Sequence, residues 1–338
     1  MKTYLLPEGG RFFKANLHSH TTVSDGKFTP KELKELYKAK GYSVLAYTDH
    51  ELIVDHSDLD DEDFLALTSM EYAFIEKEDY NTSRTIEFNL FAKDRHNTSH
   101  VCFDPSYVIH GEKWRAPHVK AVGEPFKREY TIESMQKVID EARANGFLVS
   151  LNHPSYSMET PDFFGQLKGL FAMEIYNHLS FVLCGVNDYN PGMYDSMLRQ
   201  GHRLYCIAAD DCHMGHPDDS EKCDRYGGFV MIKAEKLEYS EIISALENGN
   251  FYASQGPTIE ELYVEEGEVH LICSPAKYVA MNTEHRPYGG MRIAPEGEYI
   301  THAVFKMPKG EQKYMRFDVI DERGRHANTR AYDPKTLK

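Results

Sequence analysis

Two histidines one residue apart occur near the start of the chain, in the stretch NLHSH at positions 16–20. Residues two apart on a strand face the same side, so His18 and His20 can project together from one strand end, as a chelating pair would. The chain has 17 histidines, and a pair with this spacing often lies on a surface or in a core without binding anything. The pair alone therefore leaves a metal site and a purely structural role both open.

Further candidate ligands follow other predicted strands, at the point where each strand ends. Catalytic groups gather at strand ends on one rim of a parallel barrel. Imidazole and carboxylate ligands together suit Zn²⁺, Mn²⁺ or Fe, and this many of them fit a cluster better than a single ion. Each residue alone could have a purely structural role. For all of them together, a purely structural role is a weaker interpretation than a metal site. The candidates are Asp25, His50, Glu71, His153, Asp211 and His213.

The elements that must position these side chains alternate along most of the chain. Strand-like runs cover 44–47, 148–151, 172–176, 204–208 and 229–232. A capping box with a proline at the first helical position, Thr29-Pro30-Lys31-Glu32, predicts a helix that ends near Gly41. Apolar residues at helical spacing predict another over 131–145. Alternation of strand and helix implies parallel strands, hence a barrel or a doubly wound sheet.

Two regions break the alternation. Positions 94–130 are polar and turn-rich, and long loops of that kind are often lids or substrate loops. We expect this insertion to lie over the site and to govern substrate choice. After Pro257 the pattern changes to β-type segments at 259–264, 270–273, 301–305 and 314–320. We therefore predict a small all-β domain over 257–338, which carries none of the candidate ligands and so supports the fold or binds a partner.

Composition limits the classes of function. A net charge of −15 argues against a general nucleic-acid surface, although metal ions in a cleft could still attract anions locally. The six cysteines show no paired spacing and the first residues lack the long apolar core of a signal peptide, so we expect reduced thiols and a cytoplasmic protein. No apolar run approaches the roughly 18 residues of a membrane span, so we expect no membrane association.

Together, these motifs resemble the successive motifs of the PHP (polymerase and histidinol phosphatase) family over roughly residues 14–257. The C-terminal segment resembles the small β domain of the branch that includes carbaryl-hydrolase-like proteins. This resemblance implies a TIM-like, distorted (β/α)7 barrel over 1–256, with two or three divalent ions (Zn, Mn or Fe) at the C-terminal ends of the strands. The matching segments are His18-x-His20, Asp25-Gly26, Thr48-Asp49-His50, Glu71, Asn152-His153-Pro154 and Asp211-x-His213.

The same resemblance implies a distribution of the ligands. One ion would be held by His18, His20, Glu71 and Asp211. A second would be held by Asp25, His50 and His213. Glu71 would bridge to a third, which His153 helps to bind.

The chain departs from the family pattern on the strand after the bridging glutamate. Where relatives usually have a further histidine, residues 84–90 read RTIEFNL, so either Glu87 substitutes or His96 reaches in. Alternation sends Ile86 and Phe88 to one face of the strand and Glu87 to the other, which in a barrel points inward. A lone carboxylate buried there would need a proton, a partner or a metal. A solvated Glu87 on an exposed edge strand is the alternative.

A multi-metal site predicts hydrolysis. Such a site lowers the pKa of water, neutralises phosphate oxygens and stabilises charge on a leaving oxygen. We predict a phosphoesterase that cleaves a phosphomonoester or small nucleotide phosphodiester by metal-activated hydroxide, with His213 and His178 as candidate general acids. Arg84, Arg115 and Arg225 are candidates to hold the phosphate.

Two other functions stay open on the sequence alone. The same centre could hydrolyse a non-phosphate ester or a carbamate, or the chain could be a non-catalytic metal-binding regulatory protein whose β domain binds a partner. We expect a small phosphorylated substrate and no stable nucleic-acid complex. The oligomeric state is left open.

Overall fold

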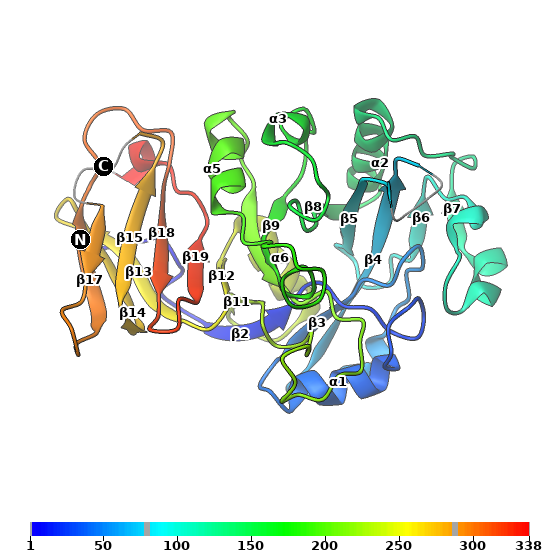
Figure 1. Cartoon of the computed structure of the whole chain (residues 1–338), viewed down its shortest axis with the longest axis horizontal. Helices are drawn as coiled ribbons and strands as arrows, with labels where there is room; N and C mark the ends of the chain where they lie inside the picture. Colours follow the sequence, from blue (N-terminus) through cyan, green and yellow to red (C-terminus); the bar gives the residue numbers. More distant parts are fainter. Residues whose placement is uncertain (1, 78–81, 286–289, 338) are drawn as a thin grey trace.

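The computed structural model describes residues 2–77, 82–285 and 290–337. The fold is mixed α/β, and its largest sheet has 13 strands in the order β10-β9-β8-β5-β4-β3-β2-β11-β12-β19-β18-β15-β16 (Figure 1). These strands are β2 (Arg11–Asn16), β3 (Val44–Tyr47), β4 (Leu65–Ile75), β5 (Thr85–Ala92), β8 (Phe147–Leu151), β9 (Ala172–Asn177), β10 (Tyr205–Ala209), β11 (Phe229–Ala234), β12 (Phe251–Ser254), β15 (Tyr278–Thr283), β16 (Met291–Ile293), β18 (Met315–Ile320) and β19 (His326–Thr329).

Both predicted helices are present. In α1 the Thr29 side chain accepts from the Glu32 amide and the Glu32 carboxylate accepts from the Thr29 amide, which is the predicted capping box. In α2 the apolar stripe is buried and the helix contacts β8. No helix in the described parts of the chain has the length and hydropathy to cross a bilayer. The α-helices are α1 (Pro30–Lys38), α2 (Ile132–Ala144), α3 (Pro161–Phe164), α4 (His178–Val182), α5 (Pro191–Arg199) and α6 (Tyr239–Asn248).

Strand direction differs from the prediction at β5, and also at β11, which runs antiparallel to β2 and β12. β2, β3 and β4 run parallel, and so do β8, β9 and β10. β5 lies between these two groups and is antiparallel to both β4 and β8. The connection from β4 to β5 spans only 76–84, which is shorter than the dozen or more residues that a parallel crossover needs. The expectation of parallel strands throughout is therefore wrong at β5.

The predicted distorted (β/α)7 barrel is not confirmed. Among the described residues the paired strands form an open sheet, not a closed barrel. β2 pairs with β3 along one edge and with the antiparallel strand β11 along the other. β2 therefore has no edge left for β10, and only the residues after β2 reach the segment after β10. There a single parallel bridge joins Ser19 to Cys212, the His20 amide donates to the Cys212 carbonyl, and the Asp211 amide donates to the His18 carbonyl. This bridge brings two predicted ligand-bearing segments together.

The C-terminal part is rich in β-structure, as the sequence predicted. β13 (Ile259–Glu265), β14 (Glu268–Ala276) and β17 (Ile300–Lys306) form a four-stranded sheet with β1 (Thr3–Tyr4). β15, β16, β18 and β19 instead extend the large sheet, because β19 pairs with β12. Strands therefore pair across the predicted boundary at 256/257, and the division into two domains stays a prediction.

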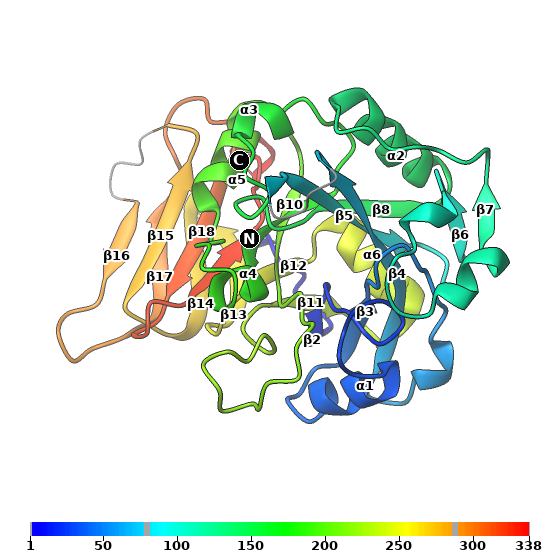
Figure 2. The same ribbon diagram turned by 45° about the vertical axis from the view of Figure 1, so that its right-hand side comes forward.

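The segment 94–130 has packed structure of its own. It contains a two-stranded parallel sheet, β6 (Ser99–Val101) and β7 (Lys120–Val122), and the 3₁₀ turns η3 (Pro105–Tyr107) and η4 (Lys113–His118), to one side of β4 in Figure 2. It contacts the loop after β2, where the Glu112 amide donates to the Val23 carbonyl. A Cβ on Gly111 would lie 2.1 Å from that carbonyl oxygen, so this close approach requires glycine.

Candidate metal centre

All nine predicted metal ligands lie together where the ends of several strands meet. Three overlapping groups have ligand atoms within 4.8 Å of one another, and His153 lies beside the third. The groups are His18, His20, Glu71 and Asp211; His20, Asp25, His50 and His213; and His50, Glu71 and Glu87.

The first group is buried and tightly spaced. His18 Nε2 lies 3.1 Å from His20 Nε2, 3.2 Å from Glu71 Oε1 and 3.1 Å from Asp211 Oδ1. Atoms bound at about 2.1 Å to one tetrahedral ion stand about 3.4 Å apart, so this spacing suits a shared cation. Asp211 Oδ1 is buried and accepts no hydrogen bond, although both imidazole nitrogens lie close to it. These four residues therefore fit a divalent metal ion, and they are the set that the family resemblance implied.

The second group is closer to solvent. The side chains of Asp25, His50 and His213 are 29%, 20% and 13% exposed, and Asp25 oxygens lie 3.5 Å from His213 Nε2 and 3.8 Å from His50 Nε2. His213 Nδ1 donates to the Asp211 carbonyl at 2.8 Å, which leaves Nε2 as the acceptor nitrogen facing Asp25. This tautomer favours a ligand role for His213 over a role as a proton donor.

Glu87 lies in the third group. Its side chain is buried, and Glu87 Oε2 lies 3.1 Å from His153 Nε2, which in turn lies 3.6 Å from Glu71 Oε1. The competing candidate, His96, is 71% exposed and pairs with Asp55 at 2.7 Å. The geometry thus favours Glu87 over His96 as the substitute ligand, while the number of ions stays a prediction.

The sequence did not reveal Glu174, which supports the first group from β9. Its carboxylate is fully buried and accepts from His18 Nδ1 at 2.7 Å, from the His153 amide at 2.7 Å and from Asn177 Nδ2 at 2.9 Å. Donation from Nδ1 fixes the His18 tautomer that presents Nε2 to a metal. The only signal in the sequence was a charged residue inside an otherwise apolar strand.

Two further supports shape the surrounding loops. The buried Asp49 carboxylate accepts from the Thr21 and Ser24 amides and hydroxyls, which fixes the turn leading to Asp25. In that turn a Cβ on Gly26 would lie 2.2 Å from the His20 carbonyl oxygen, so no other residue fits. Asn152 Nδ2 donates to Glu71 Oε1 at 2.6 Å and orients the shared carboxylate.

The charges of the site favour cations. Burial alone lowers the pKa of His18, but the carboxylates of Asp211, Glu71 and Glu174 outweigh burial and raise it to about 10. This many buried carboxylates require positive charge, which protonated imidazoles or divalent ions can supply. Because ligand histidines must be neutral, metal binding at this centre releases protons.

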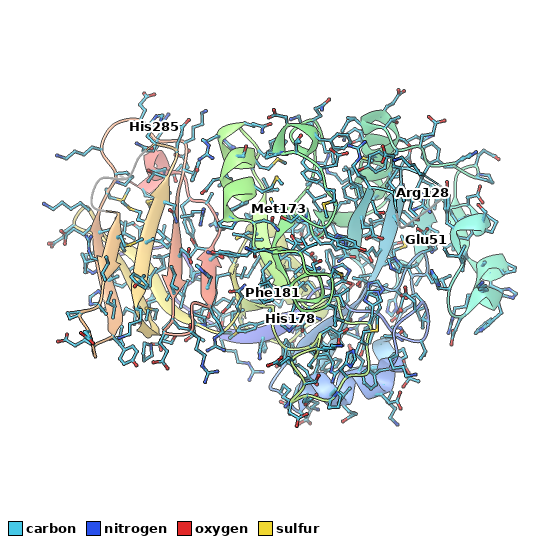
Figure 3. All side chains as sticks on the ribbon, viewed as in Figure 1. Glu51, Arg128, Met173, His178, Phe181 and His285 are labelled. Atoms are coloured by element: carbon cyan, nitrogen blue, oxygen red, sulfur yellow. The ribbon has the colours of Figure 1, made fainter. Side chains whose placement is uncertain are left out.

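A buried ion pair fixes the turn that follows His50. Both guanidinium NH₂ groups of Arg128 donate to the Glu51 carboxylate at 2.7 Å, and one also donates to the Ala73 carbonyl (Figure 3). The guanidinium carbon lies 3.8 Å from the Tyr107 ring centroid. The Glu51 amide donates to the Glu71 carbonyl. Arg128 and Tyr107 belong to the 94–130 segment, so this pair ties that segment to the metal centre.

The ligands open on one small cavity of about 120 Å³, which Tyr156, Leu179, Ser180 and Cys184 also line. Within the described chain, no lysine or arginine lines this cavity. The predicted phosphate-holding arginines are paired with acids elsewhere: Arg84 with Glu76 and Glu159, Arg115 with Glu112, and Arg225 with Asp218.

His178, the other predicted general acid, begins α4 and does not line the cavity. Its Nε2 donates to the Cys223 carbonyl at 3.0 Å, and its Nδ1 faces the Tyr176 hydroxyl at 2.8 Å; Figure 3 labels it near Phe181. Proton donation by His178 would require these bonds to change, and its catalytic role stays a prediction.

Comparisons with known proteins give structural likenesses only. No protein-family model matches the chain, and no curated protein matches it. A two-domain protein with a predicted PHP-like metal-dependent phosphoesterase from Bacteroides vulgatus is 16% identical, covers 94% of each chain and has a TM-score of 0.46. A protein assigned as a metal-dependent phosphoesterase from Bifidobacterium adolescentis is 16% identical, with 64% of this chain and 91% of that chain covered and a TM-score of 0.37.

An amidohydrolase from Chromobacterium violaceum, solved with bound sulfate and no metal, is 17% identical, with 62% of this chain and 93% of that chain covered and a TM-score of 0.38. One of these solved structures thus carries the PHP-like description that the motifs predicted. At these identities and TM-scores the likeness alone assigns no activity.

Proposed function

We propose that the chain is a metal-dependent hydrolase of the PHP type that cleaves phosphate esters. The observation that carries this proposal is the set of three overlapping ligand groups that open on one cavity. Bound divalent ions would supply Lewis acidity, a lowered pKa for water and charge neutralisation at the reacting phosphate. His18, His20, Glu71 and Asp211 would hold the most buried ion.

The remaining residues of the centre act on these ligands. Glu174 holds His18 in the tautomer that presents Nε2, and Asn152 orients Glu71. Asp49 fixes the turn before Asp25. Such supporting hydrogen bonds hold the ligands in place before an ion arrives, and their loss typically lowers metal affinity or activity by about 10- to 100-fold.

A second candidate function has one observation in its favour. Because no lysine or arginine of the described residues lines the cavity, contacts to a charged phosphate would fall on the metal ions alone. A carboxylic ester or a carbamate is neutral and needs no such cation. Hydrolysis of those substrates by the same centre is therefore the alternative, with the same ligands.

The test is a hydrolysis panel on protein of measured metal content. It compares p-nitrophenyl phosphate, bis(p-nitrophenyl) phosphate, p-nitrophenyl acetate and an aryl carbamate. The proposal expects chelator-sensitive cleavage of a phosphate substrate and a loss of several orders of magnitude in Asp211→Asn. The control Asp218→Asn changes an acid outside the cavity and should keep the wild-type rate.

Each outcome of the panel decides between functions. Cleavage of only the acetate or the carbamate would favour the alternative hydrolase. Retention of stoichiometric metal without turnover of any substrate would favour the regulatory protein. Full activity in Asp211→Asn would show that the reaction occurs at another site.

A further inference from the structure

A second cavity, of about 460 Å³, lies away from the metal centre and is called the basic cleft below. It lies between the end of α5 and the C-terminal end of the chain, which are beside each other in Figure 2. Tyr205 lines it at the start of β10, whereas the ligand Asp211 follows the other end of that strand. The length of β10, about 15 Å for five residues, lies between the two cavities, so they are distinct sites.

The charge of the basic cleft is opposite to that of the chain. Four cationic side chains line it, Arg203, Lys313, Arg330 and Lys335, against one carboxylate, Asp333, in a chain of net charge −15. Lys313 pairs with Glu284, and Lys335 has a long contact with Glu311. No acidic side chain among residues 2–77, 82–285 and 290–337 pairs with Arg203 or Arg330. Arg203 and Arg330 therefore line this cleft without a carboxylate paired to them.

Arg330 and Tyr332 pack against each other beside the basic cleft. Arg330 Nε and the Tyr332 hydroxyl have no accessible surface and make no hydrogen bond within the described chain. These two atoms therefore do not touch the cleft, and the contact of Arg330 with a ligand falls to the rest of its side chain.

The Arg330 guanidinium is also held in position. It lies over the Tyr332 ring, 4.4 Å from the centroid, and 5.8 Å from that of Tyr205. Stacking against aromatic rings fixes the plane of a guanidinium and reduces the conformational entropy that it loses on binding an anion. Guanidinium groups match phosphate oxygens in geometry. The charge of a phosphate dianion suits the excess of cations better than that of a single carboxylate.

We propose that the basic cleft binds a small phosphorylated molecule, independently of the function of the metal centre. Arg203 and Arg330 contact the phosphate group, and the rest of the 460 Å³ takes the organic part of the molecule.

The experiment is calorimetric titration of the metal-loaded full chain with phenylphosphonate, which has no ester bond to hydrolyse. The metal centre can also bind this probe, so Asp211→Asn is titrated in parallel. We expect one binding event that Asp211→Asn retains and that Arg330→Gln and Arg203→Gln weaken by about tenfold or more. Lys236→Gln removes an exposed charge outside the basic cleft and should leave the affinity unchanged.

Tyr332→Phe is a control inside the protein wall beside the cleft. Its hydroxyl has no accessible surface, so its removal should leave the affinity for phenylphosphonate unchanged. Unchanged binding in both arginine variants, or loss of all binding in Asp211→Asn, would overturn the proposal.

Discussion

Replacement of Arg128 by alanine should strongly destabilise the chain. The change leaves Glu51 as a buried carboxylate without its two hydrogen bonds, and it removes the contact with the Tyr107 ring. Arg128 is only 8% exposed and Glu51 only 5%, so water does not replace the lost partner. Breaking a buried ion pair from one side costs about 3–5 kcal/mol, and we expect a loss of that size in the free energy of unfolding.

Two further variants isolate the cause. Lys93→Ala breaks a pair with Glu247 in which the two side chains are 43% and 40% exposed, and it should cost no more than about 1 kcal/mol. The double variant Glu51→Gln/Arg128→Met removes both charges and should recover part of the stability lost in Arg128→Ala, because no unpaired charge stays buried. The assay is chemical denaturation at equal metal loading, with metal content measured for each protein.

The same pair should affect the metal centre. Because Glu51 directly follows His50, Arg128→Ala should weaken the ion held by Asp25, His50 and His213 before the more buried one. If Arg128→Ala costs no more than Lys93→Ala, the pair between Arg128 and Glu51 is not desolvated as described. If stability falls while metal content stays complete, the pair supports the fold and not the site.

Three other outcomes are expected. Glu87→Gln should lose one ion, keep the others and slow hydrolysis, whereas His96→Ala should do little; elemental analysis of both variants would show the opposite pattern if the third site lay on the loop. Burial and the charge of Arg128 lower the pKa of His100 from 6.5 to about 3. The His100 imidazole therefore binds a proton more tightly in the unfolded chain than in the folded one. The His100 contribution to stability is therefore complete above pH 6.5 and decreases as the pH falls toward 3, by about 2 kcal/mol at pH 5. Denaturation of His100→Asn should show a flatter decline over that range. Removal of the ions by a chelator should lower the melting temperature, and added Zn²⁺ or Mn²⁺ should restore it, because a ligand bound only to the folded state stabilises it.

Features set by local sequence could be predicted. The capping box of α1 lies within four residues, and the apolar stripe of α2 within one helix, so their patterns are complete in the sequence. Most of the candidate metal ligands could be predicted because they follow the ends of β2, β3, β8 and β10, whereas Glu71 lies within β4 and Glu87 near the start of β5. Their meeting at one place followed from a general rule about strand ends and not from any single motif.

Features set by distant contacts could not be predicted. Glu174 lies 156 residues from the histidine that it orients, and Arg128 lies 77 residues from Glu51. Nothing in a short window distinguishes these residues from other charged residues. The open sheet has the same origin, because it depends on β11 pairing with β2 across more than 200 residues. The barrel expected from the family resemblance gave no information on that pairing.

The prediction that Glu87 faces away from Ile86 and Phe88 did not depend on the predicted direction of β5, which was wrong. Side chains alternate with a period of two in either direction, so Glu87 faces opposite to Ile86 and Phe88 whether β5 runs parallel or antiparallel. The direction of β5 instead determines at which end of the sheet the first residues of β5, including Glu87, lie. Because β5 runs antiparallel, Glu87 lies opposite Ala73 near the end of β4, and its carbonyl accepts from the Asn152 amide just past the end of β8. A parallel β5 would carry Glu87 toward the opposite edge, so its reversal is what brings this carboxylate to the metal ligands.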